Sequence, residues 1–307
     1  MSNITAASVK ALRDLSGAGM MDCKTALVET EGDMDKAIDL LRTKGLSAAA
    51  KKSGRTASEG LVCIKIDGTK GTLVEVNSET DFVARNDIFQ KFVNQVTATA
   101  HTIDGDFDSL NSSEYPKSVQ SVEQETINIV ATIGENISIR RCESLQVVKG
   151  IISGYVHNSI AENMGKIGVL VGLESEASLE KLSTIGKNLA MHICSADPQS
   201  LDIKSLDSEV LERERQILIE QAKDTGKNPD IIEKMVEGRL RKYYEESVLL
   251  EQVYVLDTDI KVRQAIERAA KEIGSDINVT GYIRYKIGEG IDQKNDDFAA
   301  EVERMTS

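Results

Sequence analysis

The residues best suited to chemistry form one short run, in which a carboxylate and a large aromatic side chain stand side by side. Asp81 and Phe82 follow a strand-like run, residues 71–77, where the chain turns towards a helix. We expect Ser78 or Thr80 to cap this helix, and Asp81 to lie in its first turn near the positive end of the helix dipole. Phe82 would then project from a rigid helix start towards a pocket on another protein. The alternative is that Phe82 folds back into its own core.

Catalytic chemistry is hard to build from the other residues. His101, His157 and His192 are far apart, and none has a metal-ligand spacing or a nucleophile motif beside it. The run 65–71 is not a phosphate-binding loop, and Asp67-Gly68 is typical of a hairpin turn. We therefore expect structural histidines, no catalytic residue, no cofactor and no metal.

Composition narrows the class of protein further. The chain has 307 residues, 40% of them hydrophobic, which allows two or three compact units. A net charge of −13 argues against binding a nucleic acid over a broad surface. The sequence has no apolar run long enough to span a membrane and no signal-like start, which predicts a cytoplasmic protein. Four isolated cysteines indicate reduced core thiols: Cys23, Cys63, Cys142 and Cys194.

The first 45 residues read as three short helices. Val9 and Leu12 form an apolar stripe in the first helix, and Ala26 and Leu27 face inward in the second. Asp33 can cap the third, which should end before Gly45. Residues 46–58 are expected to be a linker, and the basic residues between 42 and 55 belong to a solvated surface or to a contact with an acidic partner.

Two methionines stand at the start of the second helix. Methionine side chains adapt to irregular pockets, so Met20 and Met21 are candidates for contact with a partner. We expect at least one of them to be buried, because such a small unit needs its apolar residues in its core.

The middle of the chain contains a weak internal repeat. Strand-like runs at 60–66 and 70–76 precede a helix through Phe89 and Val96, and runs at 150–156 and 168–173 precede a helix through Leu182 and Ile193. These runs form two similar units, each predicted to be a hairpin of two strands covered by a helix.

The last third is mostly helical. Residues 208–251 predict an antiparallel helical hairpin of coiled-coil type, restarted by Asn228 and Pro229. Its apolar stripes either bury against each other or form a surface for a dimer or partner. Residues 277–287 predict a strand, and 290–307 a final helix.

Four stretches resemble the elongation factor Ts family, in the family's order and over almost the whole chain. They are residues 12–24, 80–86, 235–239 and 281–291. The resemblance implies an α+β fold with small antiparallel sheets. Its parts would be a ubiquitin-associated-like domain at 1–45, a linker at 46–58, a duplicated core at 59–149 and 150–289 with the hairpin inserted at 208–251, and a C-terminal helical module at 290–307.

The resemblance also implies a guanine nucleotide exchange factor. It would bind elongation factor Tu in its GDP-bound and nucleotide-free states, disturb its magnesium site and promote GDP release, without being an enzyme itself. Phe82 would wedge beside the magnesium site and Asp81 would orient the contact, while Thr80 and Val83 fix the shape of the tip. Further contacts implied by the resemblance, besides the C-terminal helix, are Arg13, Met20, Met21, His157, Val255 and Leu256. The extra residues 158–164 depart from the family's pattern next to His157.

No nucleic-acid or membrane partner is expected, and a homodimer through the hairpin or the core stays open. A different class of function is an adaptor whose first 45 residues bind ubiquitin-like or other partners, with Asp81 and Phe82 irrelevant. A third is an enzyme that depends on one of the histidines.

Overall fold

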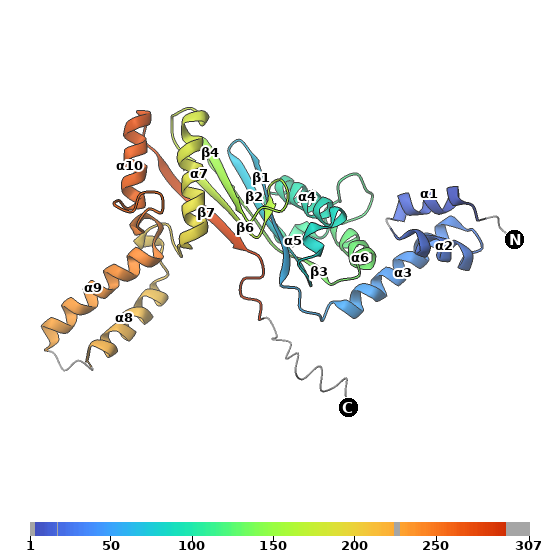
Figure 1. The fold of residues 1–307 in the computed structure, drawn as a ribbon, viewed down its shortest axis with the longest axis horizontal. Coiled ribbons are helices and arrows are strands. Elements are labelled where there is room, and N and C mark those ends of the chain that lie inside the picture. The colour runs from blue at the N-terminus through green and yellow to red at the C-terminus, as the bar shows by residue number, and fades with distance from the viewer. Residues whose placement is uncertain (1–3, 17, 224–227, 293–307) are drawn as a thin grey trace.

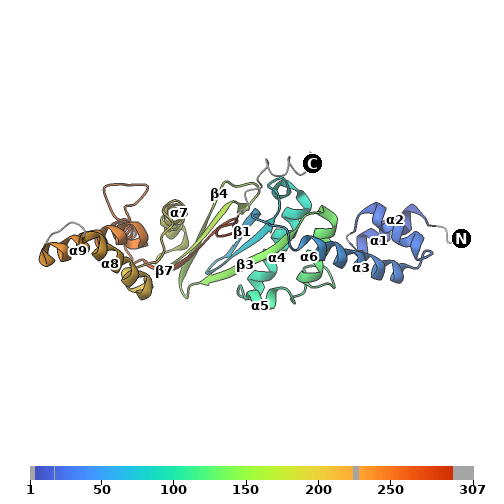
Figure 2. The same ribbon diagram turned by 90° about the horizontal axis from the view of Figure 1, so that it is seen from below.

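Two small antiparallel sheets, packed face to face, form the centre of the structure (Figure 1). The computed structural model describes residues 4–16, 18–223 and 228–292. The fold is α+β. Three helices lie at one end of an elongated molecule and two long helices lie at the other, as both views show (Figure 2).

The first sheet has the strand order β3-β2-β1-β5. Its strands are β1 (Glu59–Asp67), β2 (Lys70–Ser78), β3 (Ile137–Gln146) and β5 (Met164–Gly165). Between β2 and β3 the chain forms a 3-10 turn and three helices, namely η1 (Val83–Arg85), α4 (Asp87–Thr102), α5 (Phe107–Leu110) and α6 (Val122–Ile133). These helices bury the outer face of the sheet in a core that includes Phe89, Phe92 and Leu110.

The second sheet has the strand order β4-β6-β7. Its strands are β4 (Gly150–His157), β6 (Ile167–Glu174) and β7 (Asn278–Lys286). Between β6 and β7 lie α7 (Leu179–Ala196), η2 (Ile203–Ser205), α8 (Ser208–Lys223), α9 (Pro229–Ser247), η3 (Leu249–Glu251) and α10 (Val262–Ile273). Side chains of α7 and α10 cover the outer face of this sheet.

The alternation of side chains along a strand explains why β1 has a continuous apolar run from Leu61 to Ile64. In β1, Leu61 and Cys63 face the helices of the first core, whereas Val62 and Ile64 face the second sheet. Successive side chains of a strand point to opposite faces, so a strand segment with an apolar core on both sides is apolar at successive positions.

The two halves repeat one topology, including its irregularities. In each half a hairpin is followed by helices and by a third strand that pairs with the second strand of the hairpin. Gly60 and Gly150, near the starts of β1 and β4, have φ angles of 120° and 140°, and a Cβ there would lie 2.2 Å and 1.9 Å from a carbonyl oxygen of the neighbouring strand. Only glycine fits such a position without strain.

The three N-terminal helices are α1 (Ala6–Ser16), α2 (Met20–Glu29) and α3 (Met34–Lys52). Val9, Leu12, Ala26 and Leu27 are buried in their small core, as predicted, and the Asp33 side chain caps α3. The expected burial of Met20 or Met21 is wrong: both are exposed, because Cys23, Ala26 and Leu27 supply the inner face of α2.

The expected end of the third helix before Gly45 is also wrong. Helix α3 runs through Gly45 to Lys52, into the segment predicted as a linker. Its alanine-rich and lysine-rich last turns favour helix, and Gly45 is buried where α3 packs against α6, next to Ile127. The N-terminal helices are therefore joined to the core by a helix contact.

Helices α8 and α9 pack against each other through Leu218, Ala222 and Val236. Asn228 caps α9, and Pro229 occupies its first turn, as the sequence predicts. Val210, Ile217 and Ile231 remain exposed on this pair. No helix among the described residues is long and apolar enough to cross a membrane. The predicted final helix at 290–307 lies almost wholly outside the described residues.

Candidate functional site

The tip formed by residues 79–82 leaves the first sheet where β2 ends and presents one aromatic side chain to solvent. Phe82 is 80% exposed, and Asp81 beside it is exposed as well. Val83 and Ala84 follow directly and are buried in the first core. The prediction that Phe82 projects outward is confirmed, and its folding back into the core is excluded for this structure.

The predicted caps are wrong. Ser78 is the last residue of β2, and its hydroxyl donates to the carbonyl oxygen of Thr80 at 3.0 Å. The helix begins only at Asp87, where the Asn86 side chain accepts from the amides of Ile88 and Phe89. Phe82 therefore stands before the 3-10 turn η1 and not in a helix start. Because α4 begins only at Asp87, Val83 and Ala84 enter the first core before the helix starts.

Thr80 is held by a carboxylate from a distant part of the chain. Glu135 accepts a hydrogen bond from the Thr80 amide at 3.0 Å and another from its hydroxyl at 2.6 Å. Hydrogen bonds to an ionised acceptor are stronger than neutral ones. The residue before Asp81 is thus fixed by two bonds that do not involve regular secondary structure.

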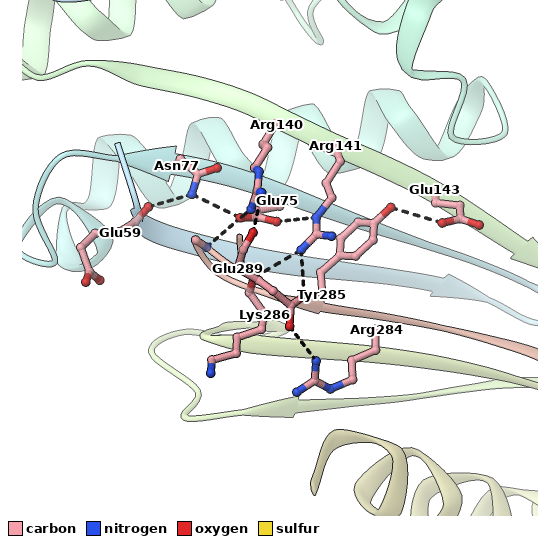
Figure 3. Close-up of polar contacts among 11 residues, drawn as sticks. Glu59, Glu75, Asn77, Arg140, Arg141, Glu143, Arg284, Tyr285, Lys286 and Glu289 are labelled. Carbon is pink, nitrogen blue, oxygen red and sulfur yellow. Dashed lines mark hydrogen bonds and ion pairs between the residues drawn. The ribbon is translucent and has the colours of Figure 1, made fainter. Parts of the chain in front are cut away.

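A buried ion cluster anchors β2 just before the tip (Figure 3). The Glu75 carboxylate, fully buried, accepts from Arg140 at 3.0 Å, from Arg141 at 2.6 Å and from the Gly288 amide at 2.8 Å. Arg141 also lies over the ring of Tyr285, 4.1 Å from its centre. A buried carboxylate is tolerated only when it is paired in this way. The cluster joins β2, β3 and the turn after β7.

His157 lies at the same end of the two sheets as the tip. It is the exposed last residue of β4, and its Nδ1 is 3.2 Å from the hydroxyl of Tyr155. Its carbonyl accepts from the amide of Lys166, whose ammonium group pairs with Glu59 at 2.6 Å. Glu59 in turn pairs with Ser78, the last residue before the tip. The intervening residues 158–164 fold back so that Met164 joins β5 and enters the first core.

The remaining predicted contact residues lie on other parts of the molecule. Arg13 is exposed on α1, and Met20 and Met21 lie on α2, at one end of the molecule. Val255 and Leu256 are partly exposed between η3 and α10, beyond the second sheet. The structure therefore places His157 at the same end of the sheets as the tip, without contact between them, and keeps the other predicted contact residues further away.

The other histidines and the cysteines belong to the interior. Burial lowers the pKa of His192, whose Nε2 is 2.9 Å from Oε1 of Gln252, and it also lowers the pKa of His101. All four cysteines are free and buried, and burial raises the thiol pKa of Cys63 and of Cys142 to about 11. Such thiols stay protonated and unreactive near neutral pH.

Comparison with known proteins gives the family. The family model described as Elongation factor TS matches residues 79–289. The protein named Elongation factor Ts of Rhodospirillum centenum is 54% identical over 305 residues, with 99% of each chain covered. The chain belongs to the elongation factor Ts family. Proteins of the same name from Rhodospirillum rubrum and Parvibaculum lavamentivorans are 52% and 51% identical, each over 98% of both chains.

Membership of the elongation factor Ts family makes this chain a translation elongation factor, and the tip at 79–82 opens the region that the family model matches. Sequence reasoning did not find Glu135, Asn136 or Glu75 as residues that hold this tip. Gly134, an ordinary helix-ending signal, is the only local sign that a polar loop starts at Glu135.

Proposed function

We propose that this protein is the guanine nucleotide exchange factor of elongation factor Tu. It binds the GDP-bound form of that GTPase, loosens the magnesium site and speeds GDP release, so that GTP can bind. The proposal includes no covalent step on this chain. It places the protein in the cytoplasm, with no nucleic acid or membrane as a partner, and treats residues 1–45 as a ubiquitin-associated-like domain.

The observation that carries the proposal is the exposure of Phe82 on a tip with a fixed backbone. A bulky aromatic side chain in water gains most when it enters a pocket on a partner. In the proposed complex Phe82 wedges beside the magnesium site, and Asp81 orients the contact. Thr80 and Val83 hold the tip from behind, one through Glu135 and one through the core. Magnesium bridges the phosphates of the bound nucleotide, so its loss weakens the hold on GDP.

The magnitudes require more than this one contact. A thousandfold faster release needs a barrier about 4 kcal/mol lower. Burying one phenylalanine side chain contributes about 1.5–3 kcal/mol. The rest must come from a broad interface that favours the nucleotide-free GTPase. Arg13, Met20, Met21, His157, Val255 and Leu256 are the proposed further contacts.

Thermodynamic reciprocity between GDP and this protein also favours an interface with several contact regions. If this protein weakens GDP binding by some factor, GDP weakens the binding of this protein by that factor. The complex must therefore be tightest with the nucleotide-free GTPase. Contacts at α2, at the tip and between η3 and α10, on separate parts of an elongated molecule, suit a partner that is gripped in several places.

Stopped-flow release of fluorescent GDP from elongation factor Tu tests the proposal. The wild-type protein should give a saturable acceleration, and Phe82→Ala should remove most of it. Val148→Ala is a matched control, because Val148 is 94% exposed at the turn that joins β3 to β4. That turn lies at the opposite end of the first sheet from the tip.

Normal acceleration by Phe82→Ala would keep the function and refute the wedge. A folded wild-type protein that does not accelerate release would refute the function. Binding of an isolated 1–45 fragment to ubiquitin-like proteins would then favour the adaptor.

A further inference from the structure

Two pairs of residues face each other across the end of the β2–β3 ladder and exchange hydrogen bonds. Glu79 and Thr80 follow β2, and Glu135 and Asn136 precede β3. Glu135 accepts from the amide and the hydroxyl of Thr80, at 3.0 Å and 2.6 Å. Glu79 in return accepts from the amide of Asn136 at 2.5 Å. We call these four residues the carboxylate clamp.

The clamp supplies hydrogen bonds just beyond the point where the backbone pairing of β2 and β3 ends. The last backbone pair of the two strands joins Ser78 to Ile137. Beyond it the strands separate, and the amides of Thr80 and Asn136 need other acceptors, because unpaired backbone groups are costly to bury. The two carboxylates supply these acceptors. Since each accepts as an anion, the bonds are stronger than the backbone pairs they replace.

The clamp also connects the tip to the N-terminal helices. Glu135 follows directly on Gly134, the left-handed cap that ends α6, and α6 packs against α3. Lys52 at the end of α3 donates to the carbonyl of Val130 at 3.5 Å. A few residues on, the side chain of Asn136 donates to the carbonyl of Arg55 at 2.7 Å, and the Arg55 guanidinium lies 3.5 Å from the Glu79 carboxylate.

Phe82 has no packing of its own that could orient it. Its side chain is 80% exposed, so its direction depends on the backbone of residues 79–82. Downstream, that backbone is held by the buried Val83 and by the bond from the Arg85 amide to the Phe82 carbonyl, 3.1 Å. Upstream, Thr80 is held by the clamp and by the Ser78 hydroxyl, which donates to the Thr80 carbonyl at 3.0 Å.

We propose that Glu135 is a positioning residue for the exchange reaction, and that it acts by holding Thr80 so that Asp81 and Phe82 are preorganised for the partner. This inference rests on the proposed function and adds a residue to it. A flexible tip would have to be ordered when it enters the GTPase. Ordering one or two residues at that step corresponds to roughly a ten- to hundredfold loss in rate.

The test compares Glu135→Ala with Glu135→Gln in the GDP-release assay, on the full chain. Glutamine keeps one acceptor oxygen, so the maximal rate should fall in the order wild type, Glu135→Gln, Glu135→Ala. The half-saturating concentration should change by less than roughly threefold, because the other contacts are untouched. Glu114→Ala, which removes an exposed carboxylate before α6, is the control for the change in charge.

A double-mutant cycle separates positioning from general damage. If Glu135 acts only through the tip, Glu135→Ala should have no further effect once Phe82→Ala is present. Amide hydrogen exchange of the free protein provides a readout that needs no partner. Glu135→Ala should speed exchange at Thr80 by roughly tenfold or more, and Glu79→Ala should do so at Asn136.

The possible results are distinct. A wild-type protein that does not accelerate GDP release overturns the proposed function and, with it, this role of Glu135. Acceleration that is sensitive to Phe82→Ala but unchanged by Glu135→Ala overturns only the positioning role. Independent, multiplicative losses in the double variant also overturn it. Loss of rate with full coupling, together with faster exchange at Thr80, supports the inference.

Discussion

Phe82 and Val83 are neighbours in the chain but face in opposite directions, since Phe82 is 80% exposed and Val83 only 6%. The boundary between the proposed contact surface and the first core therefore runs between two consecutive residues. A contact side chain so close to the core inherits the rigidity of the core, which is the property that a wedge needs.

Because Val83 is buried and Phe82 is exposed, replacing each by alanine should reduce the free energy of unfolding by different amounts. Val83→Ala should lower the free energy of unfolding by about 1–3 kcal/mol, because it leaves a cavity in a packed core. Phe82→Ala should change it by no more than about 0.5 kcal/mol, as expected for an exposed site. Urea unfolding followed by circular dichroism measures both. Equal losses would mean that Phe82 packs on its own core in solution.

The buried ion cluster predicts a loss of stability when Glu75 loses its charge. Glu75→Gln removes the negative charge between Arg140 and Arg141 and turns donors towards donors. We expect the free energy of unfolding to fall by about 1–3 kcal/mol, the range for a buried group left without its partner. Glu267→Gln, at an exposed position of α10 away from the cluster, is the matched control and should have little effect. A neutral result at Glu75 would show that water replaces the lost charge.

Gly45 in α3 and Gly60 in β1 should change the free energy of unfolding in opposite directions when each is replaced by alanine. Gly45→Ala should raise the free energy of unfolding by up to about 1 kcal/mol, because alanine favours helix. A Cβ there would lie 3.6 Å from Ile127, an ordinary contact. Gly60→Ala should lower it by at least about 1–3 kcal/mol, since the φ angle of 120° is strained for alanine and the added Cβ would lie 2.2 Å from the Val76 carbonyl oxygen. Thermal unfolding of both variants checks the signs, and a destabilised Gly45→Ala would contradict the α3–α6 packing.

The stability of the fold should decrease in mild acid because of His192. Its Nδ1 accepts from the amide of Val255 at 3.3 Å, and Nε2 faces Gln252, so the neutral ring fits the site. Burial lowers its pKa in the folded protein below the usual 6.5. The unfolded chain then binds the proton more tightly. The contribution of His192 to the free energy of unfolding is fully present above about pH 6.5. It is lost as the pH drops towards the lower pKa of the folded protein, by at most about 1.4 kcal/mol per pH unit.

Comparing the free energy of unfolding at pH 7.5 and pH 5.5 measures this effect. His192→Gln should reduce the difference between the two pH values, whatever it does to stability at pH 7.5. The pKa of His101 is lowered in the same direction, so a part of the difference should persist. An unchanged difference in the variant would refute the assignment to His192.

Much of the fold could be predicted from periodicity, and the omissions have physical causes. Strands β1, β2, β4, β6 and β7 and helix α7 follow apolar patterns and were predicted. Strand β3 was not, because Arg140 and Arg141 interrupt its pattern. These arginines belong there only because Glu75 is buried on the neighbouring strand.

The outward position of Phe82 was predicted from an expected helix start that the structure does not have, and the contacts that hold the tip were not predicted. The partner of Thr80 is 55 residues away in sequence. Ser78 and Thr80 are good capping types, yet the Ser78 hydroxyl bonds locally to the Thr80 carbonyl and Thr80 bonds to the distant Glu135, so Asn86 caps the helix instead. Local propensity could not choose among Ser78, Thr80 and Asn86 as the helix cap. The start of the helix depends on the burial of Val83 and Ala84 in the first core.

The position of β7 at the end of the described fold has a consequence for synthesis on the ribosome. Strand β6 ends at Glu174, but its second neighbour β7 begins only at Asn278. Ile283 and Tyr285 of β7 belong to the core between the sheets, and the amide of Gly288 completes the shell of Glu75. The first half can close its own sheet once β3 and β5 have emerged. The core between the sheets must wait for nearly the whole chain, so its assembly is a late event in which distant segments meet.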